Sequence, residues 1–429
     1  MILFALLKQP SLRRLLSFLL VAGAVSLGLA FFLWCPVQCW RVRQYLARGQ
    51  LGEASSLVIP LATHHRKCAE CQYLEAKVMR RQGDFRFAIQ SLDRAAALSW
   101  DAEDISRERV LASVQTGKIL ALGGELKSIF ATDLDAAETE EVYEAMALGH
   151  LAAFDGPEFQ QCLDYWLEWN PQAVKPRLLR AQFDEQLGNH FEAAKHYKTL
   201  LQDHSECLEA RLGWGACLLK LNQPAEAEMQ LRLFLSQRRE PKAAVLLSKC
   251  LVQTGQSAEA RTLLNEFHET PKAVDRAEVL EELGRLCVDQ GQAAEAVGYL
   301  EESVRLAPEA APAWHSLSSA YSLQGNLEKS KQALATSQES LLRLQRLGVI
   351  VVELSTHPEA LGLRIEAAQI LFKQGMDLDA VAWLNTIISR EAHHRQAHEL
   401  LAQYYEKQGN SKLAEHHRRF GEDSSPDNP

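Results

Sequence analysis

A repeat with a period of about 34 residues runs through most of this chain and limits the folds open to it. Each copy has a glycine, then four residues, then alanine or another small residue. Most of the intervals between successive copies equal this period. Such a period is typical of an array of small structural units, each packed on the next. Eight copies are clear, at Gly49, Gly83, Gly188, Gly255, Gly291, Gly325, Gly375 and Gly409; Asn222 replaces the glycine in another, and Gly117 and Phe154 begin degenerate copies.

The repeat predicts two antiparallel helices joined by a sharp turn. Glycine and asparagine tolerate the left-handed backbone that ends a helix, and a small residue five places later lets the second helix approach the first. Apolar residues recur at helical spacing on both sides of the turn. No alternating run typical of a strand is present in the sequence, so we predict an all-α fold. The second helix should pack through a large residue four places after the small one: Leu92, Tyr197, Leu231, Leu264, Leu300, Leu334 and Leu384.

The most regular copy resembles the tetratricopeptide repeat (TPR) family. Its matching residues are Trp314, Leu317, Ser318, Tyr321, Gly325 and Ser330. The resemblance covers residues 38–421 and implies a right-handed α-solenoid of about ten to eleven helix-turn-helix repeats. It also implies a concave groove, lined by the first helices, that binds peptides or partner proteins. It implies no reaction.

One interval departs from the period. Gly325 and Gly375 are 50 residues apart, and the sequence between them stays helical until Pro358. We expect one overlong second helix near residues 327–354. A strut packed within the fold is favoured over a helix that binds a partner, because apolar helix faces are normally buried. After the array, residues 422–429 should form a disordered acidic tail.

The N-terminal region has a different character. Residues 1–48 carry six basic side chains and no acidic one, and the stretch from Leu15 to Trp34 has no charge. Twenty such residues can cross a bilayer core of about 30 Å. We therefore expect a short tail (1–14), a transmembrane anchor (15–35) and a single-pass membrane protein, with the N-terminus in the cytoplasm and the array outside it. A cleaved signal peptide is the alternative, but its apolar region is usually shorter.

Composition excludes some functions. The chain has 46 basic and 55 acidic side chains, a net charge of -9, and therefore lacks the basic excess that neutralises nucleic-acid phosphates. Its nine cysteines are odd in number and widely spread, unlike a secreted disulfide framework. We expect no nucleic-acid partner.

Soft metal ligands cluster in one segment, where His64 and His65 precede Cys68 and Cys71. Structural zinc usually takes four ligands from two such pairs, and the sequence contains no second C-x2-C. The segment also lacks the histidine of a haem-attachment motif and the βαβ setting of a thioredoxin pair. We therefore interpret these cysteines as packing residues, and expect no metal, no cofactor and no catalytic residue. Cys35 and Cys39 flank the expected membrane exit and could be acylated or paired.

Three histidines near the C-terminus, His393, His394 and His398, include a pair four residues apart. The sequence offers no third ligand at matching spacing, so we interpret them as helix-cap and surface residues.

In the TPR family, groove positions lie ten and six residues before the turn glycine. Carried onto this sequence, and with Arg81 at the basic N-terminal end, the resemblance implies a groove that includes Tyr73, Lys77, Arg81, Gln182, Lys249, Arg285, His315, Gln369 and Gln403. The sequence therefore predicts a membrane-anchored, non-catalytic scaffold that binds a partner protein or peptide. Two alternatives remain: an envelope-assembly regulator of the same architecture, and a redox or metal protein that uses Cys68 and Cys71.

Overall fold

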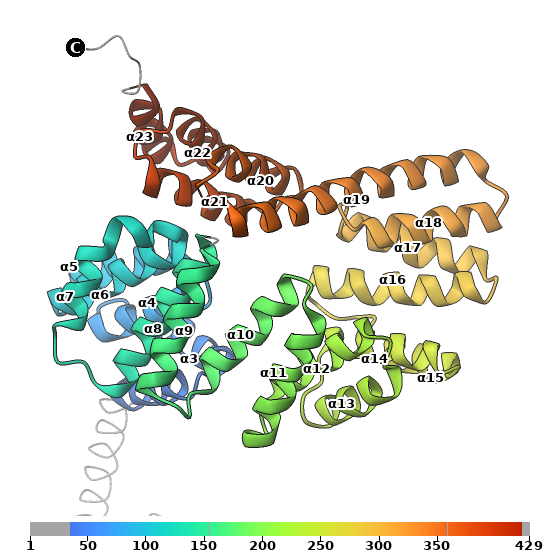
Figure 1. Ribbon diagram of the computed structural model, residues 1–429, viewed down its shortest axis with the longest axis horizontal. Helices are drawn as coiled ribbons and strands as arrows, with labels where there is room; N and C mark the ends of the chain where they lie inside the picture. Colours follow the sequence, from blue (N-terminus) through green and yellow to red (C-terminus); the bar gives the residue numbers. More distant parts are fainter. Residues whose placement is uncertain (1–34, 154, 358, 423–429) are drawn as a thin grey trace, which may run out of the picture. The chain divides into compact units, whose positions relative to one another are not determined.

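The structure is a computed structural model that describes residues 35–153, 155–357 and 359–422. Within these ranges the chain is almost entirely helical and contains no strand (Figure 1). The all-α prediction is confirmed for this part of the chain. The first helix of the described ranges comprises residues 35–47.

The helices form eleven successive pairs within the described ranges. The first helices of the pairs are residues 35–47, α4 (Ala69–Arg81), α6 (Ala102–Ser113), α8 (Ala136–Ala152), α10 (Val174–Gln186), α12 (Leu208–Lys220), α14 (Pro241–Gln253), α16 (Ala273–Asp289), α18 (Ala311–Leu323), α20 (Leu361–Lys373) and α22 (Arg395–Lys407). The second helices are α3 (Leu51–His64), α5 (Phe85–Ala97), α7 (Gly123–Phe130), α9 (Gly156–Trp169), α11 (His190–Asp203), α13 (Pro224–Gln237), α15 (Ser257–Asn265), α17 (Ala293–Leu306), α19 (Leu327–Thr356), α21 (Asp377–Arg390) and α23 (Ser411–Glu422).

The chain divides into two compact units within α8, one ending at Ala145 and the other beginning at Met146. The first unit contains the pairs up to α7, and its core joins helix 35–47 to α3, α4 and α5. The second unit contains α9 and the pairs from α10 onward, and its core is a series of hydrophobic clusters between successive helices. A repeat array is stabilised in this way, since each repeat contacts mainly its neighbours.

The turns have the predicted left-handed backbone. Positive φ angles occur at every described position of the turn glycine, from 69° at Gly49 to 86° at Gly117, and Asn222 has a φ of 58°. In the degenerate copy at Gly117, α6 continues into a π-helical turn (Val114–Lys118) before α7. Glycine therefore reverses the chain even where the rest of the repeat has been lost.

The small residues after the turns are buried, as predicted. Ala54, Ala193 and Ala296 are fully inaccessible, and Leu231 and Leu300 pack as the large residues of their pairs. In α19 the pattern fails at Leu334, which is 37% exposed; its neighbour Ala333 is buried instead.

The 30-residue helix α19 stands where the sequence predicts an overlong helix. Its first half contacts α18, and Ile350 and Leu354 in its last turns belong to the core formed with α20 and α21. The same helix therefore serves two neighbouring helix pairs. Leu342 and Val352 on its surface remain more than half exposed.

One part of the predicted fold class is wrong. The prediction includes a transmembrane helix, but no helix in the described ranges is long and apolar enough to cross a membrane. Where the structure begins, helix 35–47 buries Cys39, Val42 and Leu46 on one side against α3 and α4. Its apolar side therefore belongs to the protein core. The predicted single-pass location, with the array outside the cytoplasm, is corrected by the same finding.

Other predictions concern segments that the structure does not describe. The tail (1–14) and the span (15–35), apart from Cys35, fall outside the described residues, as do residues 423–429 of the predicted acidic tail.

Candidate functional site

A pocket of about 360 Å³ lies in the second unit and is lined only by first helices of the pairs. Its apolar lining is Leu219 of α12 with Leu246 and Val252 of α14, and four charged side chains surround it from α10, α12, α14 and α16. The combination of an apolar floor and a few charged groups is typical of a binding site. The charged residues are Glu185, Lys220, Lys249 and Arg285.

The charge of Arg285 is neutralised within the fold. Its guanidinium donates to Glu282 at 2.5 Å and to Asp289 at 3.1 Å. Glu282 is fully buried and also accepts from the Ser248 hydroxyl at 3.3 Å. Burial, together with the nearby charge of Glu282, raises the pKa of Glu281. Arg285 therefore stabilises a buried carboxylate in the wall of the pocket.

Lys249 presents a cation to the same pocket. It is half-buried, and among the described residues no carboxylate lies within 4 Å of its ammonium group. Lys220 is exposed at the edge of the pocket. These two lysines are the groups that an anionic part of a bound molecule would meet.

The other predicted groove residues divide into two sets. Gln182, His315, Gln369 and Gln403 are exposed on first helices of the second unit. In the first unit the predicted residues lie inside the fold, where Tyr73 is buried and stacks on Trp100 with 5.0 Å between ring centroids. The nine predicted residues are thus divided between the two units, three in the first and six in the second.

Three cations of α4 are paired with three carboxylates of α6 and α8, all in the first unit. Arg80 Nε lies 2.6 Å from Glu108 Oε2, and Lys77 Nζ lies 2.9 Å from Glu141 Oε2. Arg81 contacts a third carboxylate, Glu144, at 3.2 Å. Burial alone would lower the pKa of Lys77, but the two nearby carboxylates outweigh this effect and raise it. The predicted basic end of the groove is therefore neutralised.

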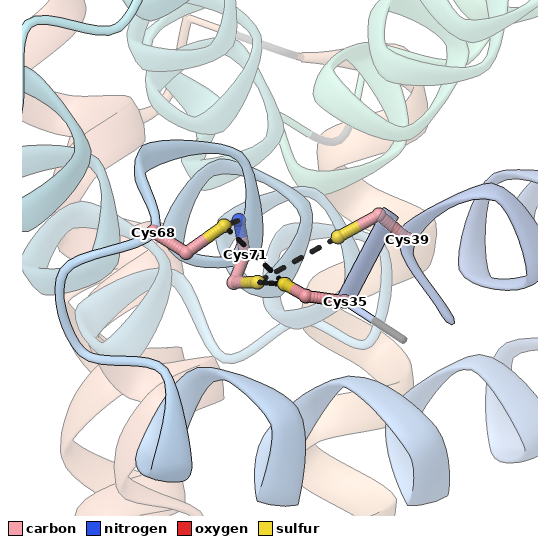
Figure 2. Close-up of side chains that lie close together, drawn as sticks. All are labelled: Cys35, Cys39, Cys68 and Cys71. Atoms are coloured by element: carbon pink, nitrogen blue, oxygen red, sulfur yellow. Dashed lines mark hydrogen bonds between the residues drawn. The ribbon is translucent and has the colours of Figure 1, made fainter. Parts of the chain in front are cut away.

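Four cysteine side chains converge at the junction of helix 35–47 with α4 (Figure 2). Cys35 Sγ lies 3.3 Å from Cys71 Sγ and 3.7 Å from Cys68 Sγ. Cys39 Sγ lies 3.6 Å from Cys71 Sγ. All four sulfur atoms lie within 4.8 Å of one another.

The cluster is partly shielded from water, which affects the thiols differently. Cys39 and Cys71 are buried, whereas Cys35 and Cys68 are half-buried. A hydrogen bond with Cys71 lowers the pKa of Cys39, and the same contact raises the pKa of Cys71. Burial raises the pKa of Cys35 to about 12.

The C-terminal histidines have two kinds of role. His394 caps α22, because its ring accepts a hydrogen bond from the Ala397 amide. His398, expected at the surface, is 3% exposed. Its Nδ1 lies 2.9 Å from His417 Nδ1, and its Nε2 lies 2.9 Å from the Ala392 carbonyl oxygen.

The tetratricopeptide repeat model matches the chain over residues 178–233 and 281–339. The chain contains tetratricopeptide repeats. The two matches run from within α10 to within α13 and from within α16 to within α19, and they include at least part of every helix that lines the pocket except α14. The comparison with curated proteins found no match.

Several solved structures are similar to this TPR chain. YrrB, described as a TPR protein with an unusual peptide-binding site, is 19% identical over 42% of this chain and 91% of its own, with a TM-score of 0.33. The human IFIT1 dimer with PPP-AAAA is 14% identical over 84% and 91%, with a TM-score of 0.43. The Cut9–Hcn1 hetero-tetramer of APC/C is 14% identical over 91% and 87%, with a TM-score of 0.36.

The four-cysteine cluster was not predicted, because the sequence contains no second C-x2-C pair. The partner pair is Cys35-x3-Cys39, which lies about one TPR period before Cys68 and Cys71. Cysteines four residues apart on a helix share one face, and the period places that face beside the next first helix. A search for pairs separated by one repeat would have found the cluster.

Proposed function

We propose that this chain is a non-catalytic scaffold that binds an extended segment of a partner protein against its first TPR helices. The pocket formed by α10, α12, α14 and α16 carries this proposal. Its four helices come from four consecutive pairs, so the binding surface crosses helices rather than running along one. An extended peptide fits such a surface because its successive side chains can reach successive helices.

The chemistry of the pocket narrows the kind of segment that it accepts. Leu219, Leu246 and Val252 offer an apolar floor, and Lys249 lies beside them with no carboxylate within 4 Å among the described residues. A large apolar side chain next to a carboxylate would satisfy both features. The carboxylate would gain a partly shielded ion pair, and the apolar group would leave water.

The exposed polar residues extend this surface in the second unit. Gln182 precedes the pocket on α10, and His315 follows it on α18. Side chains of this type supply hydrogen bonds at the rim of an interface, where they contribute more to orientation than to affinity. The paired cations of α4 are not part of the proposed surface.

A peptide-display experiment tests the proposal. A random peptide library selected on the full chain should yield binders in which an acidic residue lies next to a large apolar one. The Lys249→Glu substitution should weaken these binders about tenfold or more, because it places a negative charge beside the bound carboxylate. Lys331→Glu is the control, since Lys331 is exposed on the second helix α19. Binders that are unaffected by Lys249→Glu would contradict the proposed site.

A further inference from the structure

The four-cysteine cluster has the dimensions of a coordination site for a single ion. A zinc ion binds thiolate sulfur at about 2.3 Å, and four such ligands at the corners of a tetrahedron are about 3.8 Å apart. The closest contacts here, Cys35 to Cys71, Cys39 to Cys71 and Cys35 to Cys68, are 3.3, 3.6 and 3.7 Å. No pair exceeds 4.8 Å. The four sulfur atoms can therefore share one ion with small side-chain movements.

We propose that Cys35, Cys39, Cys68 and Cys71 together bind one zinc ion, in a tetrahedral thiolate site that joins helix 35–47 to α4. Binding replaces the protons on the thiols: each sulfur becomes a thiolate ligand, and the displaced protons pass to the solvent. No electron is transferred and no co-reactant is needed.

The backbone around the cluster favours thiolate ligands. Cys68 is the N-cap residue of α4 and Cys71 lies in its first turn. The Cys71 amide donates to Cys68 Sγ at 3.4 Å. The N-terminus of a helix carries a partial positive charge that stabilises a thiolate. Cys68 and Cys71 therefore lie at the N-terminus of α4, where the helix dipole stabilises their thiolate forms.

The pattern of contacts differs from that of two disulfides. Cys35 contacts both Cys68 and Cys71, and Cys71 contacts both Cys35 and Cys39. Two disulfides would join the four sulfur atoms in two separate pairs. In this structure Cys35 and Cys71 each contact two other cysteines, so the sulfur atoms form a single cluster. All four are free cysteines in the structure.

The size of the set also separates a single ion from an iron–sulfur cluster. In such a cluster the protein thiolates are distributed over two or more iron atoms, which spreads them apart. Four sulfurs within 4.8 Å leave room for one ion. Tetrahedral coordination by four thiolates is the preferred arrangement of structural zinc.

The remaining cysteines have a different setting. Cys162, Cys217, Cys250 and Cys287 are buried singly in the array, and within the described ranges no other group of cysteine, histidine or acidic side chains has the geometry of a metal site. Cys207 provides a matched control for Cys68. Both are half-buried N-cap residues of a first helix, Cys68 of α4 and Cys207 of α12. Serine is a good N-cap residue, so replacement of either leaves the helix start intact.

Metal analysis of the purified full chain tests the proposal. Under reducing conditions with zinc supplied, the wild type and Cys207→Ser should each contain one zinc ion per chain, and Cys68→Ser and Cys39→Ser should contain none after dialysis. Helical circular dichroism shows whether each variant has folded. Equal zinc content in Cys68→Ser and wild type, or iron in place of zinc, would overturn the site.

A cobalt titration gives an answer that does not depend on any variant. Co²⁺ added to the metal-free wild type should produce the intense absorption of tetrahedral cobalt–thiolate coordination, and zinc should then displace it. A wild-type chain that gives no such spectrum, or whose four cysteines form disulfides by mass spectrometry under reducing conditions, would also refute the proposal.

Discussion

The guanidinium of Arg80 and the carboxylate of Glu108 form an ion pair in which neither side chain is more than 2% exposed. The pair joins α4 to α6, so it links neighbouring repeats in the first unit. A buried charge requires a partner of opposite charge, because burying an unpaired charge costs several kcal/mol. The packing of α4 against α6 therefore depends on this ion pair.

Removing the carboxylate should destabilise this unit strongly. We expect Glu108→Ala to lower the free energy of unfolding by about 3–5 kcal/mol, because Arg80 would remain buried without its closest partner. Arg109→Ala is the matched control on the same helix: Arg109 pairs with Asp93, and the two side chains are 45% and 62% exposed. The control should cost less than about 1 kcal/mol. Urea unfolding followed by circular dichroism compares the two, and similar losses would contradict the buried role of Glu108.

Two of the three cations of the pocket, Arg285 and Lys249, should respond differently to substitution. Arg285→Ala should lower the melting temperature, because Glu282 is fully buried and would lose its guanidinium partner. We expect a cost of about 3–5 kcal/mol. Lys249→Ala should change stability by less than about 0.5 kcal/mol, since it breaks no ion pair in the described part of the chain. Thermal unfolding of both variants checks this; an unchanged Arg285→Ala protein would show that Glu282 does not need the ion pair.

Close helix contact at Gly284 gives a third prediction. A Cβ atom added there would meet the side chain of Leu300 inside van der Waals distance. Gly284→Ala should therefore cost about 1–3 kcal/mol through overpacking. Gly298 in the neighbouring helix α17 has open space around it, and Gly298→Ala should stabilise the helix by about 0.5–1 kcal/mol. Chemical denaturation measures both changes, and a destabilised Gly298→Ala protein would show that the open space is not available.

The imidazole of His398 should make the last TPR pair sensitive to acid. Burial lowers the pKa of His398 from the ordinary value of 6.5, and His393, His394 and His416 add to the shift when charged. Its neighbour His417 lies on α23. The neutral ring therefore stabilises the fold fully above pH 6.5, and this contribution is lost as the pH falls from there through the lowered pKa.

Unfolding measured between about pH 7.5 and about pH 5 checks this expectation. Stability should decline over the acidic half of that range, and His398→Asn should reduce the decline. His315→Asn, at an exposed position on α18, should leave it unchanged. An identical pH profile for wild type and His398→Asn would disprove the assignment.

Local backbone chemistry explains why the helix pairs could be predicted from the sequence. A turn that requires positive φ selects glycine or asparagine, and Asn222 adopts the same conformation as the glycines in its place. The residue five places later must be small, because the two helices of a pair approach each other closely at that position. Both constraints act within one repeat, so a single sequence reveals them.

Contacts between repeats were harder to predict. The partners of Lys77 and Arg80 lie on α6 and α8, in the next two helix pairs along the chain, and nothing in their local sequence identifies the carboxylates. Cys35 and Cys39 were missed for the same reason, since their role depends on the neighbouring repeat. Burial of His398 follows from the packing of α23, which spacing within α22 does not reveal.

The first two and the last helix pairs of the described ranges contain buried side chains that respond to solution conditions. Sulfur atoms of Cys39 and Cys71 lie in the core between the first and second pairs, and imidazole rings of His398 and His417 lie in the last pair. Each repeat contacts mainly its neighbours, so separate repeats can open independently. Oxidants and acid would therefore loosen different helix pairs independently, and the pocket of the second unit would keep its shape under both.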